Sequence, residues 1–331
     1  MMRIYSPGAE RAVCVTACDL VTLPADAVWI DMLEPTPAEE AFVERALGVM
    51  VPTRDEMVEI EPSSRLYQEN GAIYVTATVL SGLADDDLIL TAVSFVLTPT
   101  HLVTVRYARP RAFETIKAHA ERAPLLTGDP GAVLVALLDA IVDRLADILE
   151  GVGTDMDRIS RSTFRRAKIH RNARISTAAL QVLLSRIGHA QDVVAKARDS
   201  ALTLGRVIGF LTFAMNHDRS DKAVVGEREH LKTLARDISA LTDHANYLGT
   251  NVTFLLDAVL GLINLEQANI AKIFSIAALV FLPPTLVAGV YGMNFEILPE
   301  LQWRFGYLWA LGVMFASAIL PFLVFRWRGW L

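Results

Sequence analysis

The sequence predicts an α+β membrane protein built from an N-terminal α/β domain, a long helical stalk and two C-terminal transmembrane helices. Three observations lead to this fold class. The chain of 331 residues is 53% hydrophobic with a mean hydropathy of +0.36, which is apolar for a soluble protein. No proline occurs from Gly131 to Leu282, and two long runs near the end of the chain carry no charged residue. The length allows about two domains.

Residues 1–125 are predicted to form a cytosolic α/β domain with a mixed sheet. The predicted strands are four runs rich in β-branched and apolar residues, at 27–33, 72–80, 88–98 and 101–108. The stretch "TPAEEAFVERALG" predicts a helix with Thr36 as N-cap, Pro37 at its first position and Glu39 at its third. The acidic stretch "ADDDL" at 84–88 is most simply a solvated turn.

Residues 126–272 are predicted to form the helical stalk. Apolar residues recur at helical spacing in "AVLVALLDAIVDRLADILEGV" and in "LKTLARDISALTDHANYLGTNVTFLLDAVLGLI". The best break between them is "AMNHDRSDKAVVGE", so we expect a long antiparallel helical hairpin. Its last arm begins near Asp221 or later and continues into the first membrane span. A helix of ~70 residues would be about 105 Å long.

Residues 273–291 and 305–325 are predicted transmembrane helices, because they contain 19 and 21 consecutive positions without a charge. A bilayer core of ~30 Å needs about 20 apolar residues in a helix. A pair of buried core helices is the alternative, and the uncharged length argues against it. Residues 292–304 then form an external loop, and residues 326–331 form a basic tail.

Flanking charges predict the orientation. Lys272 precedes the first span, Arg326 and Arg328 follow the second, and Arg304 in the loop is outnumbered by Glu296 and Glu300. This positive-inside bias places both termini in the cytosol, with the spans in the cell inner membrane. No signal peptide is predicted, because no apolar region follows a basic start. Aromatic residues expected at the membrane interfaces are Trp303, Tyr307, Trp327 and Trp330.

Composition and motifs argue against several other functions. The net charge is −6 and no long basic stripe occurs, so nucleic acid is not an expected partner. Cys14 and Cys18 lack further ligands for a zinc site and are expected to be reduced thiols on one strand face. No His-Glu-x-x-His site, Walker loop or Gly-x-Ser-x-Gly elbow is present, so an enzyme is not expected.

The first span carries a stripe of small and polar residues on one face. Positions seven apart on a helix share a face, with a drift of ~20° per heptad. The stripe comprises Asp257, Asn264, Ala271, Ala278, Thr285 and Gly292, together with Gly261, Ala268, Ser275, Leu282 and Gly289. The opposite face carries Val259, Glu266, Ile273, Val280 and Val287. The stripe fits either close helix packing or a water-filled axis shared by several copies of the chain.

The residues after the first span favour the shared axis. Gly292 suits the left-handed residue that ends a helix, and a helix C-terminus carries about half a negative charge. In a ring of subunits, the amide of Asn294 with nearby Glu296 and Glu300 would form a mouth that attracts cations. An uncharged amide can hold a hydrated ion without removing its water, and Mg²⁺ is the ion that most resists dehydration.

The C-terminal sequence closely resembles the CorA magnesium transporters. The resemblance rests on "KIFSIAALVFLPPTLVAGVYGMNFEILPELQWRFGY", with the triplet Gly292, Met293 and Asn294 directly after the first of two spans, and on the tail "FRWRGWL". The close match covers about the last 70 residues, and "AVWIDMLEPTPAEE" is similar to the opening strand and helix of that family.

The resemblance implies a homopentameric funnel that conducts divalent cations passively, with no cofactor besides the transported and regulatory Mg²⁺. The triplet would be the selectivity filter for hydrated Mg²⁺, with Co²⁺ and Ni²⁺ often admitted. Cytosolic Mg²⁺ bound between subunits would hold the pore closed. The expected pore-lining residues are Asp257, Asn264, Ala271, Phe274, Ser275, Ala278, Leu282, Thr285 and Gly289.

Departures from the family pattern leave parts of this picture open. Ala271 stands where some members have a bulky gate residue and Ala268 where some have an amide, which places gating on Leu282 or Phe274. The regulatory carboxylates are not fixed, and the candidates by charge are Asp85, Asp86, Asp87, Asp218 and Asp221. Two alternatives are a Zn²⁺ transporter of the same fold and a membrane-anchored cation sensor that does not conduct.

Overall fold

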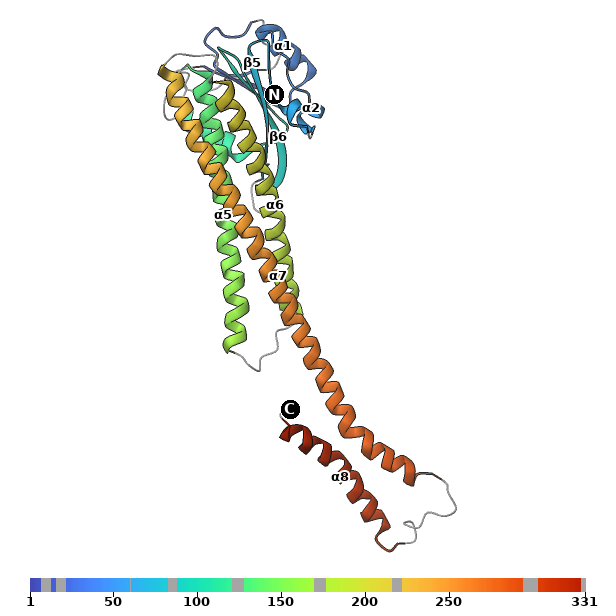
Figure 1. Ribbon diagram of the computed structural model, residues 1–331. Coiled ribbons are helices and arrows are strands. Elements are labelled where there is room, and N and C mark those ends of the chain that lie inside the picture. Colours follow the sequence, from blue (N-terminus) through green and yellow to red (C-terminus); the bar gives the residue numbers. More distant parts are fainter. Residues whose placement is uncertain are drawn as a thin grey trace. The chain divides into compact units, whose positions relative to one another are not determined.

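The structure is a computed structural model of the chain (Figure 1). It describes residues 1–6, 13–15, 22–59, 61–82, 88–120, 128–169, 177–215, 222–293 and 303–328. The chain divides into two compact units. The N-terminal unit comprises Met1–Arg171 and Gln181–Leu256, and the C-terminal unit comprises Asn172–Leu180 and Asp257–Leu331.

A mixed seven-stranded sheet lies in the N-terminal unit, as the sequence predicts. The strands are β1 (Met2–Tyr5), β2 (Val13–Val15), β3 (Trp29–Leu33), β4 (Leu66–Glu69), β5 (Ala72–Ser81), β6 (Ile89–Leu97) and β7 (Leu102–Arg106). Their order is β2-β1-β3-β7-β6-β5-β4, and only the pair β3 and β7 is parallel. The four predicted strand runs correspond to β3, β5, β6 and β7, and the short strands β1, β2 and β4 complete the sheet.

Helix α1 (Pro37–Leu47) forms where its capping residues predict it. The Thr36 hydroxyl accepts a hydrogen bond from the Glu39 amide at 3.3 Å, and the Glu39 carboxylate accepts one from the Thr36 amide at 2.8 Å. This capping box pairs two amides that the first turn of a helix leaves without a backbone partner. Gly48 ends the helix in the left-handed region, at φ 68°, where a glycine carries no steric penalty.

Helices cover both faces of the sheet and bury a core on each. Alternate strand residues point to opposite faces, so Trp29 belongs to one core and its neighbour Ile30 to the other. The core that contains Ile30 includes residues of α1 and of α2 (Arg54–Val58). The core that contains Trp29 includes α4 (Arg111–Ala120) and three long helices. A single turn, α3 (Pro62–Arg65), precedes β4.

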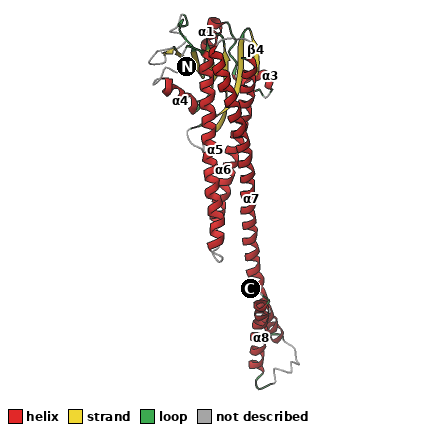
Figure 2. Ribbon diagram, turned by 60° about the vertical axis from the view of Figure 1, so that its left-hand side comes forward, coloured by secondary structure: helices red, strands yellow, loops and turns green. Residues whose placement is uncertain are grey.

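The three long helices are α5 (Pro130–Ile169), α6 (Thr177–Ala214) and α7 (Lys222–Tyr291), and they lie side by side in the N-terminal unit (Figures 1 and 2). The prediction of a hairpin with two arms is therefore wrong, because there are three long helices. The last of them does begin next to Asp221, as predicted. The missed break follows α5, in "HRNARIS", where the apolar periodicity lapses and basic residues gather. The absence of proline from Gly131 to Leu282 is compatible with helices throughout this region, but it does not indicate where one helix ends and the next begins.

The first residues of α7 rest on the start of α5. A Cβ added to Gly131 would lie 2.5 Å from the Oε2 atom of Glu227, a side chain that is 9% exposed. The Asp129 carboxylate accepts a hydrogen bond from the Gly131 amide at 2.9 Å and caps α5. Two carboxylates therefore meet the positive end of the α5 dipole, which favours negative charge there.

The outer edge of β5 is occupied by a side chain of α6. Strand β4 pairs only with residues 72–75 of β5, which leaves 76–81 without a strand on that side. Thr203 fills one position: its hydroxyl accepts a hydrogen bond from the Thr78 amide at 3.1 Å and can donate to the Thr78 carbonyl at 3.2 Å. The helix thus pairs a backbone edge that would otherwise be open.

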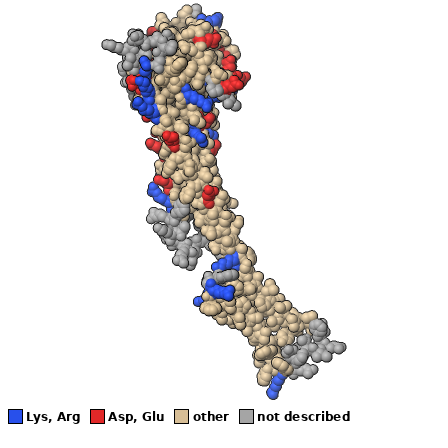
Figure 3. Space-filling model, viewed as in Figure 1, with Lys and Arg blue, Asp and Glu red and all other residues tan. Residues whose placement is uncertain are grey.

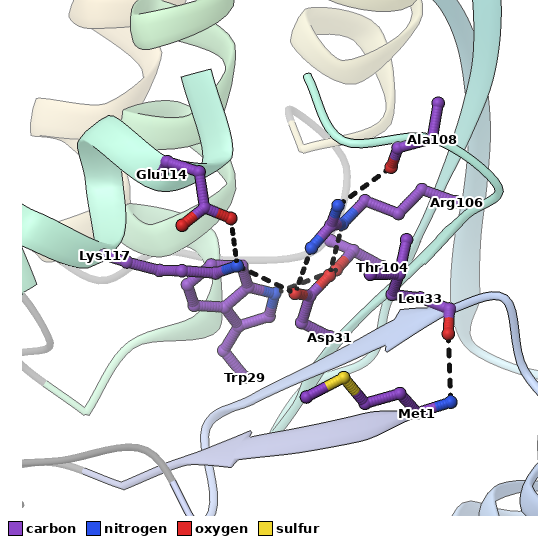
Figure 4. A network of polar contacts seen from close by, with 9 residues as sticks. All are labelled: Met1, Trp29, Asp31, Leu33, Thr104, Arg106, Ala108, Glu114 and Lys117. Atoms are coloured by element: carbon purple, nitrogen blue, oxygen red, sulfur yellow. Dashed lines mark hydrogen bonds and ion pairs between the residues drawn. The ribbon is translucent and has the colours of Figure 1, made fainter. Parts of the chain in front are cut away.

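A buried ionic network joins the middle of the sheet to α4 (Figure 4). The Asp31 carboxylate accepts two hydrogen bonds from the Arg106 guanidinium, at 2.8 and 2.7 Å, and both side chains are 1% exposed. Thr104 donates to the same carboxylate and accepts from the Trp29 indole. Lys117 lies 3.6 Å from Asp31. This network is not among the features predicted from the sequence.

The C-terminal unit contains the last part of α7, from Asp257 to Tyr291, and α8 (Gly306–Trp327). The stretch 83–87, and with it the predicted turn around Asp85, lies outside the described residues. Cys14 is on β2, whereas Cys18 is outside the described part, so the expectation of a shared strand face stays a prediction.

Candidate ion-conduction site

Two helices have the length and composition needed to cross a membrane. One is α8 and the other is α7 from Gly226 to Tyr291. Each contains a stretch of 18 residues with a mean hydropathy of 2.2. From residue 273 to residue 293, α7 and the two residues after it carry no Asp, Glu, Lys or Arg. Figure 3 shows charged side chains concentrated on the N-terminal unit, whereas the surface of the two apolar helices is almost uncharged.

The predicted pore-lining side chains share one property: they are exposed in the single chain. These residues are Asp257, Asn264, Ala271, Phe274, Ser275, Ala278, Leu282, Thr285 and Gly289. On the opposite face Val259 is buried and Glu266, Val280 and Val287 are half-buried, whereas Ile273 is exposed. The small-residue stripe is thus uncovered in the single chain, as are bulky residues beside it such as Phe281 and Leu286, so what distinguishes the stripe is its composition.

The hydroxyl groups of the stripe keep free acceptor capacity. Thr285 donates to the Phe281 carbonyl at 2.7 Å, and Ser275 donates to the Ala271 carbonyl at 2.9 Å. Each hydroxyl has one proton and two lone pairs, so these bonds use the proton within the helix. The lone pairs remain available to donors outside the helix, such as the water shell of a cation.

Pro283 and Pro284 lie inside α7 in the middle of its uncharged segment. A proline has no amide proton to donate, so the carbonyls four residues earlier, of Leu279 and Val280, lose their usual backbone partner. Unpaired carbonyls at membrane depth are tolerated where they meet protein or line a water-filled cavity. These two carbonyls add acceptors to a segment that otherwise has few.

The end of α7 differs from the sequence expectation at Gly292. Its amide donates to the Ala288 carbonyl at 2.9 Å and closes the helix, but its φ is not positive, unlike that of Gly48, Gly71, Gly82 and Gly128. The prediction that Gly292 has a left-handed backbone conformation is therefore wrong. A Cβ at Gly292 would lie 3.1 Å from the Ala288 oxygen, so close approach of the backbone is what a glycine allows here.

Several predicted site residues lie outside the described part of the chain. Asn294, Glu296 and Glu300 are among them, whereas Gly292 and Met293 are described. The candidate regulatory carboxylates Asp85, Asp86, Asp87, Asp218 and Asp221 are also outside it. Within the described ranges, no group of three His, Cys, Asp or Glu residues is placed to hold a metal ion.

Comparison with known proteins identifies the family. The model of the CorA-like Mg²⁺ transporter protein family matches residues 24–327. This chain belongs to the CorA family. The magnesium transport protein CorA of Salmonella typhimurium LT2 is 33% identical over 306 residues, which is 92% of each chain. The protein of the same description from Escherichia coli K12 has the same identity and coverage.

Solved structures show the same fold as this CorA-family chain. The complete CorA magnesium transporter of Methanocaldococcus jannaschii has a TM-score of 0.75 and 16% identity, covering 100% of this chain and 98% of that one. The full-length CmaX protein has a TM-score of 0.67 and 14% identity, covering 98% and 96%. The predicted architecture of an α/β domain, long helices and two C-terminal apolar helices is confirmed. The CorA family consists of transporters, in agreement with the expectation that the chain is not an enzyme.

The residues that sequence reasoning missed lie in the N-terminal unit. Asp31 and Arg106 each interrupt or end an otherwise apolar strand run, in "AVWIDML" and "HLVTVRYA". A charge inside a run that must be buried predicts a charged partner, because an unpaired buried charge is too costly. That signal would have paired these two residues before the structure was known.

Proposed function

We propose that the protein is a passive channel for Mg²⁺ in the cell inner membrane, with Co²⁺ and Ni²⁺ as further permeant ions. Five copies surround a common axis, each contributing α7 to the pore, and both termini lie in the cytosol. Two spans in one chain cannot enclose a pore, so closed symmetry between copies is required. The family membership and the 33% identity to two magnesium transport proteins support the ion assignment.

The observation that carries the proposal is the uncovered face of α7. A helix face that meets only lipid carries bulky apolar side chains, whereas small and hydroxyl-bearing residues are typical of a face that meets protein or water. Here the exposed stripe is small, glycine-bearing and hydroxyl-bearing, and its hydroxyl lone pairs are unused. Such a face fits an aqueous axis better than lipid.

Gly292, Met293 and Asn294 are proposed as the selectivity filter. They follow α7 directly, where its last carbonyls carry the negative end of the helix dipole. In a ring, the Asn294 amides contact the first hydration shell of Mg²⁺ without replacing it, and Glu296 and Glu300 raise the local cation concentration. The dehydration cost of Mg²⁺ is thereby avoided at the entrance.

Leu282 and Phe274 are proposed as the gate. They are the bulky residues among the predicted pore-lining positions, 67% and 69% exposed, and the other pore-lining positions are small or polar. A ring of such side chains blocks ions when the apolar constriction excludes water. Ala271 is too small for this purpose.

The test is ion flux into proteoliposomes, with Mg²⁺, Co²⁺, Ni²⁺ and Zn²⁺ compared. We expect Mg²⁺ flux in the wild type and its loss in Asn294→Ala, because the amide that holds the hydrated ion is removed. Asn269→Ala makes the same chemical change on α7 away from the stripe and should conduct normally. The mass of the detergent-solubilised protein should correspond to five chains in all three proteins.

Other outcomes would overturn the proposal. Flux of Zn²⁺ in preference to Mg²⁺ would indicate a zinc transporter of the same fold. No flux of any ion, with the oligomer intact and both spans inserted, would indicate a membrane-anchored sensor. Near-normal Mg²⁺ uptake by Asn294→Ala would remove Asn294 from the filter.

A further inference from the structure

A cavity of about 240 Å³ lies on the sheet face that α1 and α2 cover, within the N-terminal unit. Its lining residues come from β4, β5, α2, α3 and the residues beside these two helices: Pro52, Glu56, Glu59, Ser63, Ser64, Tyr67, Tyr74 and Thr76. At ~30 Å³ for each water, the volume has room for about eight water molecules. No residue of the proposed pore borders it.

The cavity wall is fixed by Arg65. Its guanidinium donates to the Glu59 carbonyl, to the Val58 carbonyl at 3.3 Å and to the Thr78 hydroxyl at 3.2 Å. These bonds tie the end of α2 to strand β5, so the wall stands at a set distance from the sheet. They also engage the guanidinium of Arg65, which is therefore poorly available to an anion in the cavity.

Two stacked tyrosines form one side. Tyr67 of β4 and Tyr74 of β5 are directly opposite each other, with ring centroids 4.5 Å apart and planes 8° from parallel. The Tyr74 hydroxyl accepts a hydrogen bond from the Met50 amide, whereas no hydrogen bond within the described part of the chain involves the Tyr67 hydroxyl. Burial beside Tyr74 and Glu56 raises the pKa of Tyr67 to about 12, so that hydroxyl keeps its proton.

The floor supplies hydroxyl groups. Thr76 is 6% exposed and shares a hydrogen bond with Ser94 of the neighbouring strand. Two hydroxyls that pair with each other use one of their two protons, and lone pairs remain on both oxygens. Ser63 and Ser64 of α3 also line the cavity and add two more hydroxyls. The interior is therefore polar and rich in acceptors.

Two carboxylates stand at the rim, one helical turn apart. Glu56 uses its Oε2 atom to accept hydrogen bonds from the amide and the hydroxyl of Thr53, which orients the side chain and leaves Oε1 for another donor. Glu59 follows the last residue of α2 and is exposed. The opening thus has a net negative charge next to an aromatic wall.

We propose that this cavity binds a small aliphatic diammonium ion. Ammonium groups donate up to three hydrogen bonds, which the rim carboxylates and the hydroxyl oxygens can accept, and a cation is attracted to the exposed face of a tyrosine ring. The methylene chain of such a ligand lies against Tyr67. Mg²⁺ keeps most of its water shell and can be held by one or two carboxylates, so it is the competing ligand that the test must separate from a diammonium ion. The inference does not depend on the transport function.

The test is calorimetric titration of the full-length protein in detergent with putrescine, at a series of Mg²⁺ concentrations from chelated to saturating. We expect one site per chain with an affinity of about millimolar, because exposed ion pairs contribute little each. Combined Glu56→Gln and Glu59→Gln should weaken binding at least ~10-fold, about 1.4 kcal/mol. Gln keeps the capping oxygen at Glu56, so α2 should stay folded.

Two further variants separate ligand contact from a general charge effect. Tyr67→Leu removes the aromatic wall and should also weaken putrescine binding, whereas Glu69→Gln removes a charge on the same strand outside the cavity and should not. Equal binding in all variants would show that putrescine binds to general surface charge. Mg²⁺ that displaces putrescine competitively would make the site a metal site, and absence of binding heat in the wild type would also overturn the proposal.

Discussion

Asp31 and Arg106 show how much a single buried ion pair controls in this fold. The pair is bidentate, almost inaccessible to water, and surrounded by Trp29, Thr104 and the ring of Phe113, whose centroid lies 4.6 Å from the guanidinium carbon. Burying two charges is costly, but removing only one leaves the other without compensation. Removing one partner alone is therefore expected to lower the free energy of unfolding more than replacing both partners by apolar residues.

Asp31→Asn is expected to destabilise the protein by about 3–5 kcal/mol, because Arg106 would remain charged and buried. The measurement is the midpoint of thermal or urea unfolding in detergent. Replacing both residues together, as Asp31→Leu with Arg106→Met, should recover much of the loss. If the double variant is less stable than Asp31→Asn alone, the uncompensated charge is not the cause.

Asp143, unlike Asp31, is surrounded by charges of its own sign. Partial burial, followed by the charges of Asp139, Asp147 and Asp237, raises the pKa of Asp143 above its ordinary value. His230 of α7 lies 3.2 Å from Asp139, and Arg111 and Arg144 line the same groove between α4 and α5. A raised pKa means that the folded state binds the proton more tightly than the unfolded state does. Stability is then lost as the pH rises through the folded pKa.

Asp143→Asn should therefore raise the free energy of unfolding at pH 7 by about 0.5 kcal/mol, the size usual for substitutions at exposed positions, and the unfolding midpoint should rise with it. The gain should disappear when the pH falls below 3.8, the ordinary pKa of the carboxyl, because both proteins are then neutral at this position. The control is Asp157→Asn, which breaks an exposed pair with Arg161 and should not stabilise. A gain that persists in acid would contradict the electrostatic explanation.

At the scale of the elements, length decided which predictions succeeded. The runs at 27–33, 72–80, 88–98 and 101–108 predicted β3, β5, β6 and β7, because seven or more residues contribute to each, and helical periodicity predicted α7. The strands β1, β2 and β4 have three or four residues and α2 has five, and no run of that length was predicted around them. The break after α5 was missed for a related reason, since only composition marks it. Gly292 was misread because glycine permits both a left-handed backbone and a close approach.

Helix α7 gives the sharpest test of the proposed pore axis. A Cβ at Gly289 would meet nothing within 4 Å in the chain, so a larger side chain there does not disturb the fold of a single copy. Gly289→Leu should reduce Mg²⁺ flux at least about tenfold by filling the axis. Val287→Leu adds bulk on the opposite face and should conduct nearly as the wild type. Equal effects of the two changes would contradict the assigned faces.

Close packing of the stripe against neighbouring copies is the competing explanation, and Thr285→Val separates the two. Valine has nearly the shape of threonine but no hydroxyl, so packing is retained while the lone pairs facing the axis are lost. A water-filled axis predicts lower flux with an unchanged oligomer mass. Unchanged flux would favour a packing role for this position.

At the scale of the whole molecule, we expect internal Mg²⁺ to regulate flux. The candidate carboxylates for this regulation lie outside the described residues. Carboxylates that face each other across subunits repel, and a divalent ion converts that repulsion into attraction. Because several sites act together, small differences in affinity between closed and open states sum to the few kcal/mol that a switch needs. We expect flux to fall steadily as internal Mg²⁺ rises from chelated to several millimolar. The measurement is flux or current at defined internal Mg²⁺, and a flat response would show that this protein lacks such feedback.

The contact between Thr203 and the edge of β5 has a consequence for assembly in a crowded membrane. An open strand edge is a template on which a neighbouring sheet can add its own strand, and such pairing leads to aggregation. If the protein forms the proposed ring, its copies meet at close range, where strand exchange between sheets would compete with assembly. Because a threonine of α6 occupies the amide and the carbonyl of Thr78, that part of the edge offers no template. In the proposed ring, copies would therefore meet through surfaces other than this part of the sheet edge.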